Sequence, residues 1–425
     1  MAGAIPAENV TDFIRQKVEI LTKETTLFEL NAPTYKAIKP AVRTEPITQK
    51  GYRLPHWNRM PGGIGGFIPG DSSFNKYVAP NSRSMYVFPT YMAQPILMDG
   101  STMRMLESGS ESKVQTLGDL IDLHYKEFTK GIEYMATGDG SGTLAVTSGT
   151  GSTLGTGQTL TCTTTAATTP GQTKGTRRLR NGHYYEFANP TTRAVGGGFL
   201  VEADSAGATS TINLLWGSWG SGDLVTWPNS IDRMPRGLGH LISDASRILQ
   251  TLNTANDANL NSTFIDLAGN LCTPTTFDRA KTALQMRNND ANAENGLMDF
   301  TTFNQYSILK RQGWNLTIQP TTETVGVAKV YKDGDTNFVR SKDMDEDRHY
   351  FAFPETLVNF EEMALSEFNL DQQQWRMLLG NNGTGSDAYQ KAFGICFNMG
   401  VLRPIQCAGI KRALITSTET QVSVG

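Results

Sequence analysis

The chain has 425 residues, a net charge of −3 and 38% hydrophobic residues, which suits about two or three domains with sizeable cores. The near-neutral charge gives no global basic field, so it argues against tight general binding to nucleic acid or to an anionic membrane surface. The four cysteines are widely spaced and form no CxxC pair, which favours a reducing cytoplasm over a disulfide framework. Neither a signal-peptide core nor an apolar window long enough to span a membrane occurs.

The first expected element is a short amphipathic helix near the N-terminus. Its apolar residues recur at three- and four-residue spacing at Val10, Phe13, Ile14, Val18 and Leu21. A Pro-punctuated extended stretch, residues 27–50, follows it. We interpret residues 1–50 as an arm that lies across a neighbouring subunit, with Phe13 in the contact. The alternative is a terminal helix docked on its own chain.

Residues 51–97 are typical of a long two-armed β-hairpin, with arms around 51–59 and 83–97 and a Gly/Pro-rich tip. An isolated hairpin is marginal in water. This one nevertheless carries eight aromatic rings, at Tyr52, Trp57, Phe67, Phe74, Tyr77, Tyr86, Phe88 and Tyr91. The rings need a partner surface, supplied either by the chain's own domain or by another subunit. At ~3.3 Å per residue the second arm would reach roughly 50 Å, which favours another subunit.

The hairpin is also basic, with Arg53, Arg59, Lys76 and Arg83 against the single acid Asp71. This bias predicts an acidic landing surface on the neighbour. The candidate contact residues of the hairpin are Arg53, Trp57, Arg59, Phe67, Phe74, Lys76, Tyr77 and Arg83.

A long amphipathic helix is predicted over residues 114–136, because its apolar residues step by three and four. The Gly-rich turn at 138–142 ends it. Carboxylates mark the side that we expect to face solvent. Those proposed as the landing surface are Asp119, Asp122, Glu127 and Glu133.

Residues 144–235 are expected to form a small all-β module. Strands are predicted at 144–147, 159–164, 183–187, 198–202 and 211–216. The Thr/Gly-rich start, which has no charged residue over 144–173, could instead be a flexible loop.

Residues 236–425 are expected to be mixed α/β. One helix is predicted around 240–252, and another has Thr273 as its N-cap and Pro274 in its first turn. Further segments of this part are 327–331, 350–353, 375–379 and the apolar end 394–414. No repeat with a period of 20–50 residues occurs.

Catalytic and metal-binding patterns are absent from the sequence. It contains neither GxSxG, a P-loop nor HExxH, and its five histidines never stand at ligand spacing. We therefore expect no enzyme, no cofactor and no metal. The acidic stretches 333–337 and 343–347 fail the EF-hand pattern and are interpreted as solvated turns. The basic run from Lys174 to Arg180 could contact phosphate, but an exposed hairpin tip is the favoured interpretation.

The order of these parts resembles the major capsid proteins of tailed double-stranded DNA bacteriophages, which have the HK97-type fold. The resemblance implies an α+β fold with an N-terminal arm (1–50), an E-loop hairpin (51–100), a spine helix with part of the P-domain (101–143), an inserted β-barrel-like domain (144–235), and the P-domain and A-domain (236–425). Local similarities at 272–280, 296–300 and 394–414 support it. This family has no short diagnostic motif, so the ordered set of parts carries the resemblance.

The resemblance implies a structural protein whose hexamers and pentamers build an icosahedral shell around the phage genome, without sequence-specific DNA binding and without a membrane. It implies a virion protein that is assembled in the host bacterial cytoplasm with a portal and, in some relatives, a decoration protein. The hairpin begins by about residue 50, which leaves no room for a long cleavable scaffolding segment, so we expect a separate scaffolding protein. Lys76 lies where some relatives carry a crosslinking lysine, but nothing identifies its acceptor.

Two rival functions remain open at this point. One is an encapsulin-like compartment of the same fold that encloses protein cargo. The other is a polysaccharide-active enzyme with a β carbohydrate-binding module, against which the missing signal peptide counts.

Overall fold

The structure is a computed structural model. It describes residues 32–38, 46–47, 51–59, 81–99, 111–155, 157–163, 175–191, 193–203, 208–288, 297–311, 317–318, 331–333, 336–368, 376–379 and 385–415. The α-helices of these residues are α2 (Pro33–Ala37), α4 (Glu111–Thr137), α5 (Leu238–Leu241), α6 (Pro274–Asn288) and α7 (Phe303–Arg311). The short 3-10 helices are η1 (Thr254–Asn256), η2 (Ala258–Leu260) and η3 (Pro404–Gln406).

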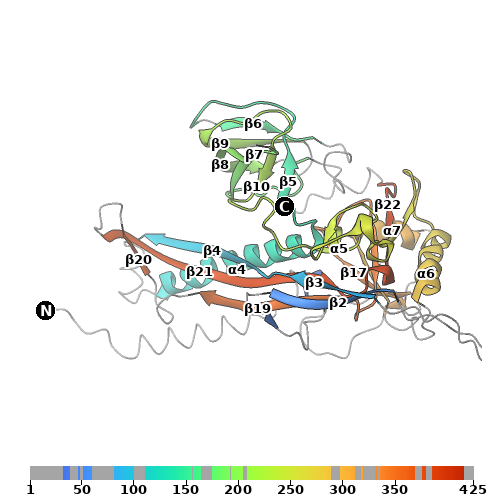
Figure 1. The fold of residues 1–425 in the computed structure, drawn as a ribbon. Coiled ribbons are helices and arrows are strands. Elements are labelled where there is room, and N and C mark those ends of the chain that lie inside the picture. Colours follow the sequence, from blue (N-terminus) through green and yellow to red (C-terminus); the bar gives the residue numbers. More distant parts are fainter. Residues whose placement is uncertain are drawn as a thin grey trace, which may run out of the picture.

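The long helix α4 lies along a long antiparallel sheet (Figure 1). The strands of this sheet are β4 (Thr90–Asp99), β19 (Leu357–Phe368), β20 (Arg376–Leu379) and β21 (Gly385–Val401). β21 is central, with β4 on one side and β19 and β20 in tandem on the other. The Tyr125 ring of α4 contacts Phe393 of β21 with centroids 5.5 Å apart. The helix predicted over 114–136 is confirmed and is slightly longer, at 27 residues, or roughly 40 Å.

The predicted hairpin pairs β2 (Gly51–Arg59) with β3 (Asn81–Val87), and β1 (Pro46–Ile47) adds to β2. The expectation that 83–97 forms one continuous second arm is wrong. Pro89 has no N–H to give to a ladder, and after it the chain continues as β4, which pairs with β21 over its whole length. Of the predicted second arm, only β3 therefore belongs to the hairpin. The described part of this arm does not extend over roughly 50 Å.

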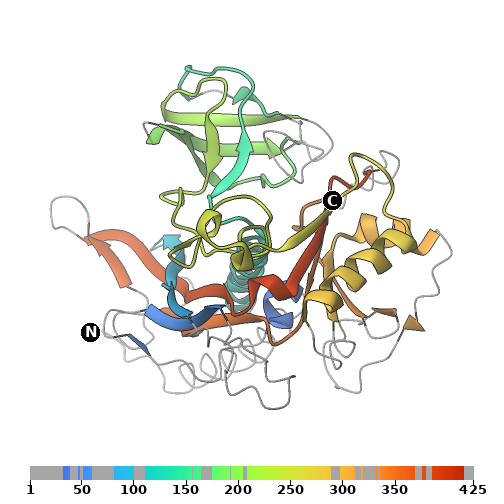
Figure 2. The same ribbon diagram turned by 45° about the vertical axis from the view of Figure 1, so that its right-hand side comes forward.

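A six-stranded sheet lies above the C-terminal part of α4 (Figures 1 and 2). We call it the β body. Its strands are β5 (Thr143–Val146), β6 (Gly157–Thr161), β7 (Tyr184–Asn189), β8 (Arg193–Ala203), β9 (Thr209–Gly217) and β10 (Leu224–Thr226), in the order β5-β10-β7-β8-β9-β6. The two edge strands meet, because Thr147 bridges Cys162 and the Thr163 N–H donates to the Val146 carbonyl at 2.8 Å. The sheet therefore curls toward a barrel. The five strands expected in this segment overlap β5 to β9.

A seven-stranded mixed sheet lies beyond the long sheet. Its strands are β13 (Thr263–Asp266), β14 (Leu297–Thr301), β15 (Thr317–Ile318), β16 (Tyr331–Asp333), β17 (Thr336–Arg340), β18 (His349–Ala352) and β22 (Cys407–Lys411), in the order β13-β22-β18-β14-β17-β16-β15. Figure 2 shows α6 and α7 beside it. Phe277 of α6 and Tyr306 of α7 both contact Phe338 of β17, with ring centroids 5.6 Å apart in each case. The opposite face, with Phe300 and Tyr350, joins the larger core.

The middle of this sheet holds a buried charged pair. The Nδ1 atom of His349 lies 3.0 Å from Oδ2 of Asp299, and both side chains have no exposed surface. Burial alone would lower the pKa of His349, but the Asp299 charge reverses this effect and raises the pKa to about 10. Because an unpaired charge there would be costly, the pair favours the observed alignment of β14 with β18.

The helix start at Thr273 and Pro274 is confirmed. The Thr276 N–H donates to Oγ1 of Thr273 at 3.3 Å, and α6 begins at Pro274. The segment around 350–353 contains β18, and β20 covers 376–379. The segment 394–414 contains the end of β21, the 3-10 helix η3 and β22.

The helix expected around 240–252 is wrong. Only α5, one turn long, forms there, and the short strands β11 (Ile248–Leu249) and β12 (Leu252–Asn253) follow it. The Arg247 guanidinium donates to the carbonyls of Leu241, Ser243 and Ala245, which competes with helical hydrogen bonding. Gln250 and Thr251 then adopt φ values of 47° and 75°, which a right-handed helix excludes.

Replacing the most central aromatic residue of the α6 core tests this packing. Phe277 is fully buried against Phe338 and Phe351, so we expect Phe277→Ala to lower the free energy of unfolding by about 3–5 kcal/mol. Urea denaturation followed by circular dichroism measures the change.

The matched control is Phe303→Ala in α7, because Phe303 is 49% exposed. This variant loses mainly the contact of the Phe303 ring with the Arg340 guanidinium. We expect this loss to lower the free energy of unfolding by about 1 kcal/mol or less. Equal losses in the two variants would contradict the assignment of the core.

Candidate functional site at the hairpin base and the charged cleft

The base of the hairpin packs on its own chain. Leu54, Met85 and Val87 are buried there, and the Tyr52 ring lies 5.0 Å from that of Phe360. For the base, the expectation that another subunit supplies the partner surface is therefore wrong. Successive side chains of a strand point to opposite faces, so a strand pair can bury one face against the core and leave the other face exposed to solvent.

Two polar contacts fix the base to the segment that follows α5. Nε2 of His56 lies 3.1 Å from Oδ2 of Asp257, and both side chains are buried. The Tyr86 N–H donates to the Gln250 carbonyl at 2.9 Å. The described base of the hairpin is therefore fixed in direction relative to this segment.

The exposed arginines of the hairpin lie on opposite faces. Arg53 is paired across the ladder with Tyr86, whereas Arg83 is opposite His56, on the face that is buried nearer the base. Both arginines are exposed, and Nε of Arg53 donates to Oγ of Ser84 at 2.8 Å. One flat acidic surface could not meet both guanidinium groups.

Several predicted contact residues lie outside what the structure describes. Phe13, Phe67, Phe74, Lys76 and Tyr77 fall outside the described residues. Trp57 and Arg59 lie in β2, and Asp119 and Asp122 lie in α4, but only their backbone is described. Their contact roles stay predictions.

Glu127 is engaged within the chain. It accepts from Nζ of Lys130 at 2.5 Å and from the Arg180 guanidinium at 2.9 Å, and His183 lies 3.6 Å away. The hydrogen bond from His183, together with these cations, outweighs burial and holds the pKa of Glu127 well below its usual range. This carboxylate therefore links α4 to the β body, and it is not a free landing charge.

Glu133 is buried, so the expectation that it faces solvent is wrong. Only 1% of the residue is exposed, and its Oε2 accepts from the backbone N–H groups of Thr34 and Tyr35 at 3.0 and 3.3 Å. These two donors belong to the first turn of α2, whose own N-cap residue, Ala32, has no side-chain acceptor. Glu133 thus supplies the cap of α2 from another helix. Burial raises the pKa of Glu133 to about 7.

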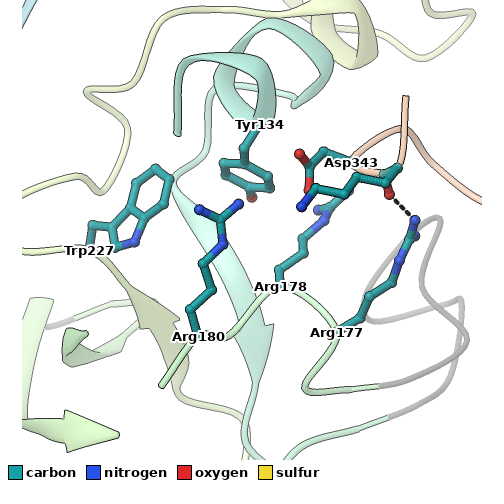
Figure 3. A pocket seen from close by; sticks show the side chains of 7 residues that line it. Tyr134, Arg177, Arg178, Arg180, Trp227 and Asp343 are labelled. Atoms are coloured by element: carbon teal, nitrogen blue, oxygen red, sulfur yellow. Dashed lines mark hydrogen bonds between the residues drawn. The ribbon is translucent and has the colours of Figure 1, made fainter. Parts of the chain in front are cut away.

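A charged cleft of about 170 Å³ opens between α4, the β body and the segment before β18 (Figure 3). The residues that line it are Tyr134, Arg177, Arg178, Arg180, Trp227, Lys342 and Asp343. In Figure 3 the Arg180 side chain rises between Trp227 and Tyr134. The Arg178 guanidinium lies 4.9 Å from the centre of the Tyr134 ring.

The walls of this cleft pair two charge runs that are far apart in the sequence. Arg178 lies 3.2 Å from Asp345, and Arg177 lies 3.3 Å from Glu346. Asp345 also accepts a hydrogen bond from the Tyr350 hydroxyl at 2.6 Å. These contacts hold the β body against the seven-stranded sheet.

Both sequence interpretations of these runs are wrong for the described residues. Arg177 and Arg178 are not at an exposed hairpin tip, since their side chains are only 19% and 10% exposed. The acidic stretch is not a solvated turn, because Asp345, Glu346 and Asp347 are all buried. A buried charge is costly unless a charge of opposite sign is paired with it. The presence of two complementary charge runs in one chain is the only sequence signal that could have indicated this contact.

Within the described residues, no group of three or more His, Cys, Asp or Glu side chains could hold a metal ion. Among the same residues, no helix is both long and apolar enough to cross a membrane. His124 shares a hydrogen bond of 3.2 Å with Gln94 and so ties α4 to β4.

The fold has counterparts among solved structures. The capsid of cyanophage A-1(L) aligns with 90% of this chain and 93% of its own, at 10% identity and a TM-score of 0.52. The capsid of a native GTA particle aligns at 8% identity over 90% of both chains, with a TM-score of 0.46. The SrpI encapsulin of Synechococcus elongatus aligns at 8% identity over 91% of this chain and 90% of its own, with a TM-score of 0.44.

The first of these likenesses shows that the chain has a mixed α/β fold of the kind found in a phage capsid protein. The other two are weaker, and no argument is based on them. No protein-family model matches the sequence, and no curated protein matches it.

The buried carboxyl group of Glu133 predicts a pH dependence of stability. Its pKa is about 7 in the folded chain against an ordinary 4.5, so between these pH values the folded chain holds a proton that the unfolded chain has lost. The free energy of unfolding therefore falls as the pH rises through this range, by about 3 kcal/mol from this group.

Glu133→Gln removes this titration and keeps an acceptor for α2. Urea unfolding at about pH 5 and about pH 8 should show a flatter pH dependence in the variant by about 3 kcal/mol. Other buried carboxyl groups, such as Asp347, titrate in both proteins, so the difference between the two isolates Glu133. Equal pH dependences would refute the assignment.

Proposed function

We propose that this chain is the major capsid protein of a tailed double-stranded DNA bacteriophage, and that many copies of it form the icosahedral shell around the genome. The observation that carries the proposal is the alignment with the cyanophage A-1(L) capsid, which spans nearly the whole of both chains. An alignment of this extent covers nine-tenths of the chain and not one common motif. The proposed role is mechanical and not catalytic.

The proposal assigns a part to each region of the HK97-type fold. Residues 1–50 are the N-terminal arm, 51–100 the E-loop, and 101–143 the spine helix with part of the P-domain. Residues 144–235 are an inserted β-barrel-like domain, and 236–425 form the P-domain and A-domain. Two observations support this assignment: α4 packs along β21, and the edge strands β5 and β6 contact each other.

The hairpin is the proposed clasp between subunits. Arg53 and Arg83 face opposite ways, so the clasp meets two surfaces and not one. Arg59, Lys76 and the aromatic residues Trp57, Phe67, Phe74 and Tyr77 remain candidate contacts toward the tip, and Phe13 remains one in the arm. Asp119 and Asp122 stay the candidate landing charges on α4, because Glu127 and Glu133 are engaged inside the subunit.

The proposal also names the partner proteins of the chain, the site of its assembly and its final location. Hexamers and pentamers of the chain form the shell, with a separate scaffolding protein, a portal and an optional decoration protein. The net charge of −3 suits a shell that encloses DNA without adhering to it. Assembly takes place in the host bacterial cytoplasm, and the protein resides in the virion.

Assembly of the expressed chain tests the proposal. Size-exclusion chromatography and negative-stain electron microscopy, with and without a scaffolding protein from the same genome, should show closed shells or their hexamers and pentamers. Particles from infected cells should contain DNA that nucleases cannot reach. A monomer that never assembles contradicts a shell protein, and shells filled with protein cargo and no DNA favour an encapsulin-like compartment.

Removing the hairpin tip tests the clasp. We expect deletion of residues 61–71 to leave the circular dichroism spectrum and unfolding midpoint of the subunit unchanged, because the base is already packed on its own chain. Shell yield should fall at least tenfold. Loss of soluble subunit would show that the tip belongs to the subunit core.

Charge reversal separates the two faces of the clasp. Arg53→Glu and Arg83→Glu should each impair assembly, and the double variant should be worse than either, because the two arginines face different surfaces. Arg412→Glu, on an exposed arginine of the seven-stranded sheet that is paired with Asp266, is the control and should assemble normally. Assembly followed by light scattering measures the effect.

A further inference from the structure

The cleft of Figure 3 has more positive than negative charge at its surface. Four of its seven lining residues are cationic, and Asp343 is the only acid among them. Two separate segments supply these cations, namely the loop before β7 and the segment before β18, and the charge of Lys130 in α4 also acts on Lys342. Such a convergence of like charge is unfavourable unless counter-charges offset it.

Carboxylates of the chain itself offset only part of this charge. Arg177 pairs with Glu346, Arg178 with Asp345 and Arg180 with Glu127. Lys342 differs, because within the described residues no hydrogen bond or ion pair engages its ammonium group, which is exposed at the cleft. Partial burial is the largest cause that lowers the pKa of Lys342, and Arg180 and Lys130 lower it further. Asp343 and Glu127 act in the opposite direction without reversing the shift.

Arg178 holds a second unused donor. Its side chain is only 10% exposed, and its Nε–H is buried without any acceptor among the described residues. A buried donor without a partner is uncommon in native proteins and calls for an explanation, such as an absent ligand. Figure 3 shows the Arg178 side chain reaching into the cleft beside Tyr134.

The aromatic residues keep these donors in place. The Tyr134 ring lies under the Arg178 guanidinium, and the Trp227 ring meets Tyr134 edge-on with centroids 5.3 Å apart. The Tyr134 hydroxyl is itself used, because it donates to the Thr143 carbonyl at 2.9 Å. The donors are therefore held in position before a ligand arrives, which lowers the entropic cost of binding.

We propose that this cleft is a binding site for one phosphate group, held by the Lys342 ammonium, the Nε–H of Arg178 and the guanidinium of Arg180. The proposal goes beyond the capsid function. A phosphate offers more acceptor oxygens, in more directions, than the two of a carboxylate, which suits donors that arrive from several sides. A volume of about 170 Å³ exceeds the ≈30 Å³ that one water occupies in the liquid several times over.

Binding there would link three parts of the subunit. The phosphate would touch the loop of the β body and the segment before β18 at once, directly beside α4. The unfolding midpoint of the full chain should therefore rise with phosphate concentration, since a ligand of the folded state stabilises it.

The experiment titrates the purified full chain with inorganic phosphate in a calorimeter, at constant ionic strength adjusted with sodium chloride. Adenosine monophosphate and acetate are the second and third probes. We expect saturable binding of inorganic phosphate, of the monophosphate, or of both, and at least tenfold weaker binding of acetate. Tighter binding of the monophosphate would assign a phosphate ester as the source, and tighter binding of inorganic phosphate would assign the free ion.

Matched variants locate the site. Lys342→Gln should weaken phosphate binding at least tenfold, and Lys342→Arg should retain it. Lys411→Gln is the control, since that lysine pairs with Asp244 on another surface. Arg180→Gln, which removes the cation and leaves Glu127 paired with Lys130, serves as a second site variant if Lys342→Gln fails to fold.

Three results would overturn the proposal. The first is no phosphate-dependent heat or midpoint shift in the wild-type chain. The second is unchanged binding in a folded Lys342→Gln or Arg180→Gln variant. The third is acetate bound as tightly as phosphate, which would make the cleft a carboxylate site for an acidic protein segment.

Discussion

The structure depends on one constraint, which is that the polar groups in the last turns of α4 are buried and must find partners within the chain. Thr129, Glu133 and Thr137 follow each other at four-residue spacing, and none is more than 1% exposed. Glu133 caps α2, and the Thr137 hydroxyl lies 3.1 Å from the Asp343 carbonyl, to which it can donate. The N-terminal segment and the segment before β18 are thereby both positioned on one helix. Polar contacts, and not only apolar ones, decide where the parts of the subunit meet.

The sequence predicts the elements that have strong periodicity or clear punctuation. The apolar steps of α4, the Thr273–Pro274 start of α6 and the alternating strands of the β body each reflect a local rule that holds in the structure. The helix expected around 240–252 fails because its apolar spacing also fits a turn whose carbonyls Arg247 binds. Local pattern alone could not distinguish the two.

The candidate site is harder to predict, because it depends on contacts between distant segments. The helical periodicity predicts that Glu133 lies on the solvent-exposed face of the helix. It is buried because α2 packs against it. The basic run and the acidic run each resemble ordinary surface loops, and their meeting at Arg178 and Asp345 follows from how the β body sits on α4. The hairpin splits at Pro89 because β21 competes for its second half.

The continuity of β3 with β4 gives the hairpin a mechanical consequence. A neighbour that pulls on the hairpin along its strands would load β4 in the direction of its own axis, through the short Phe88–Pro89 connection. The ladder between β4 and β21 runs from Thr90 opposite Phe397 to Asp99 opposite Ala388, and its hydrogen bonds lie across that load. Under such shear all the hydrogen bonds of the ladder carry the load together. They do not open one pair after another. Tension between neighbouring molecules would thus pass into β21, the longest of the described strands.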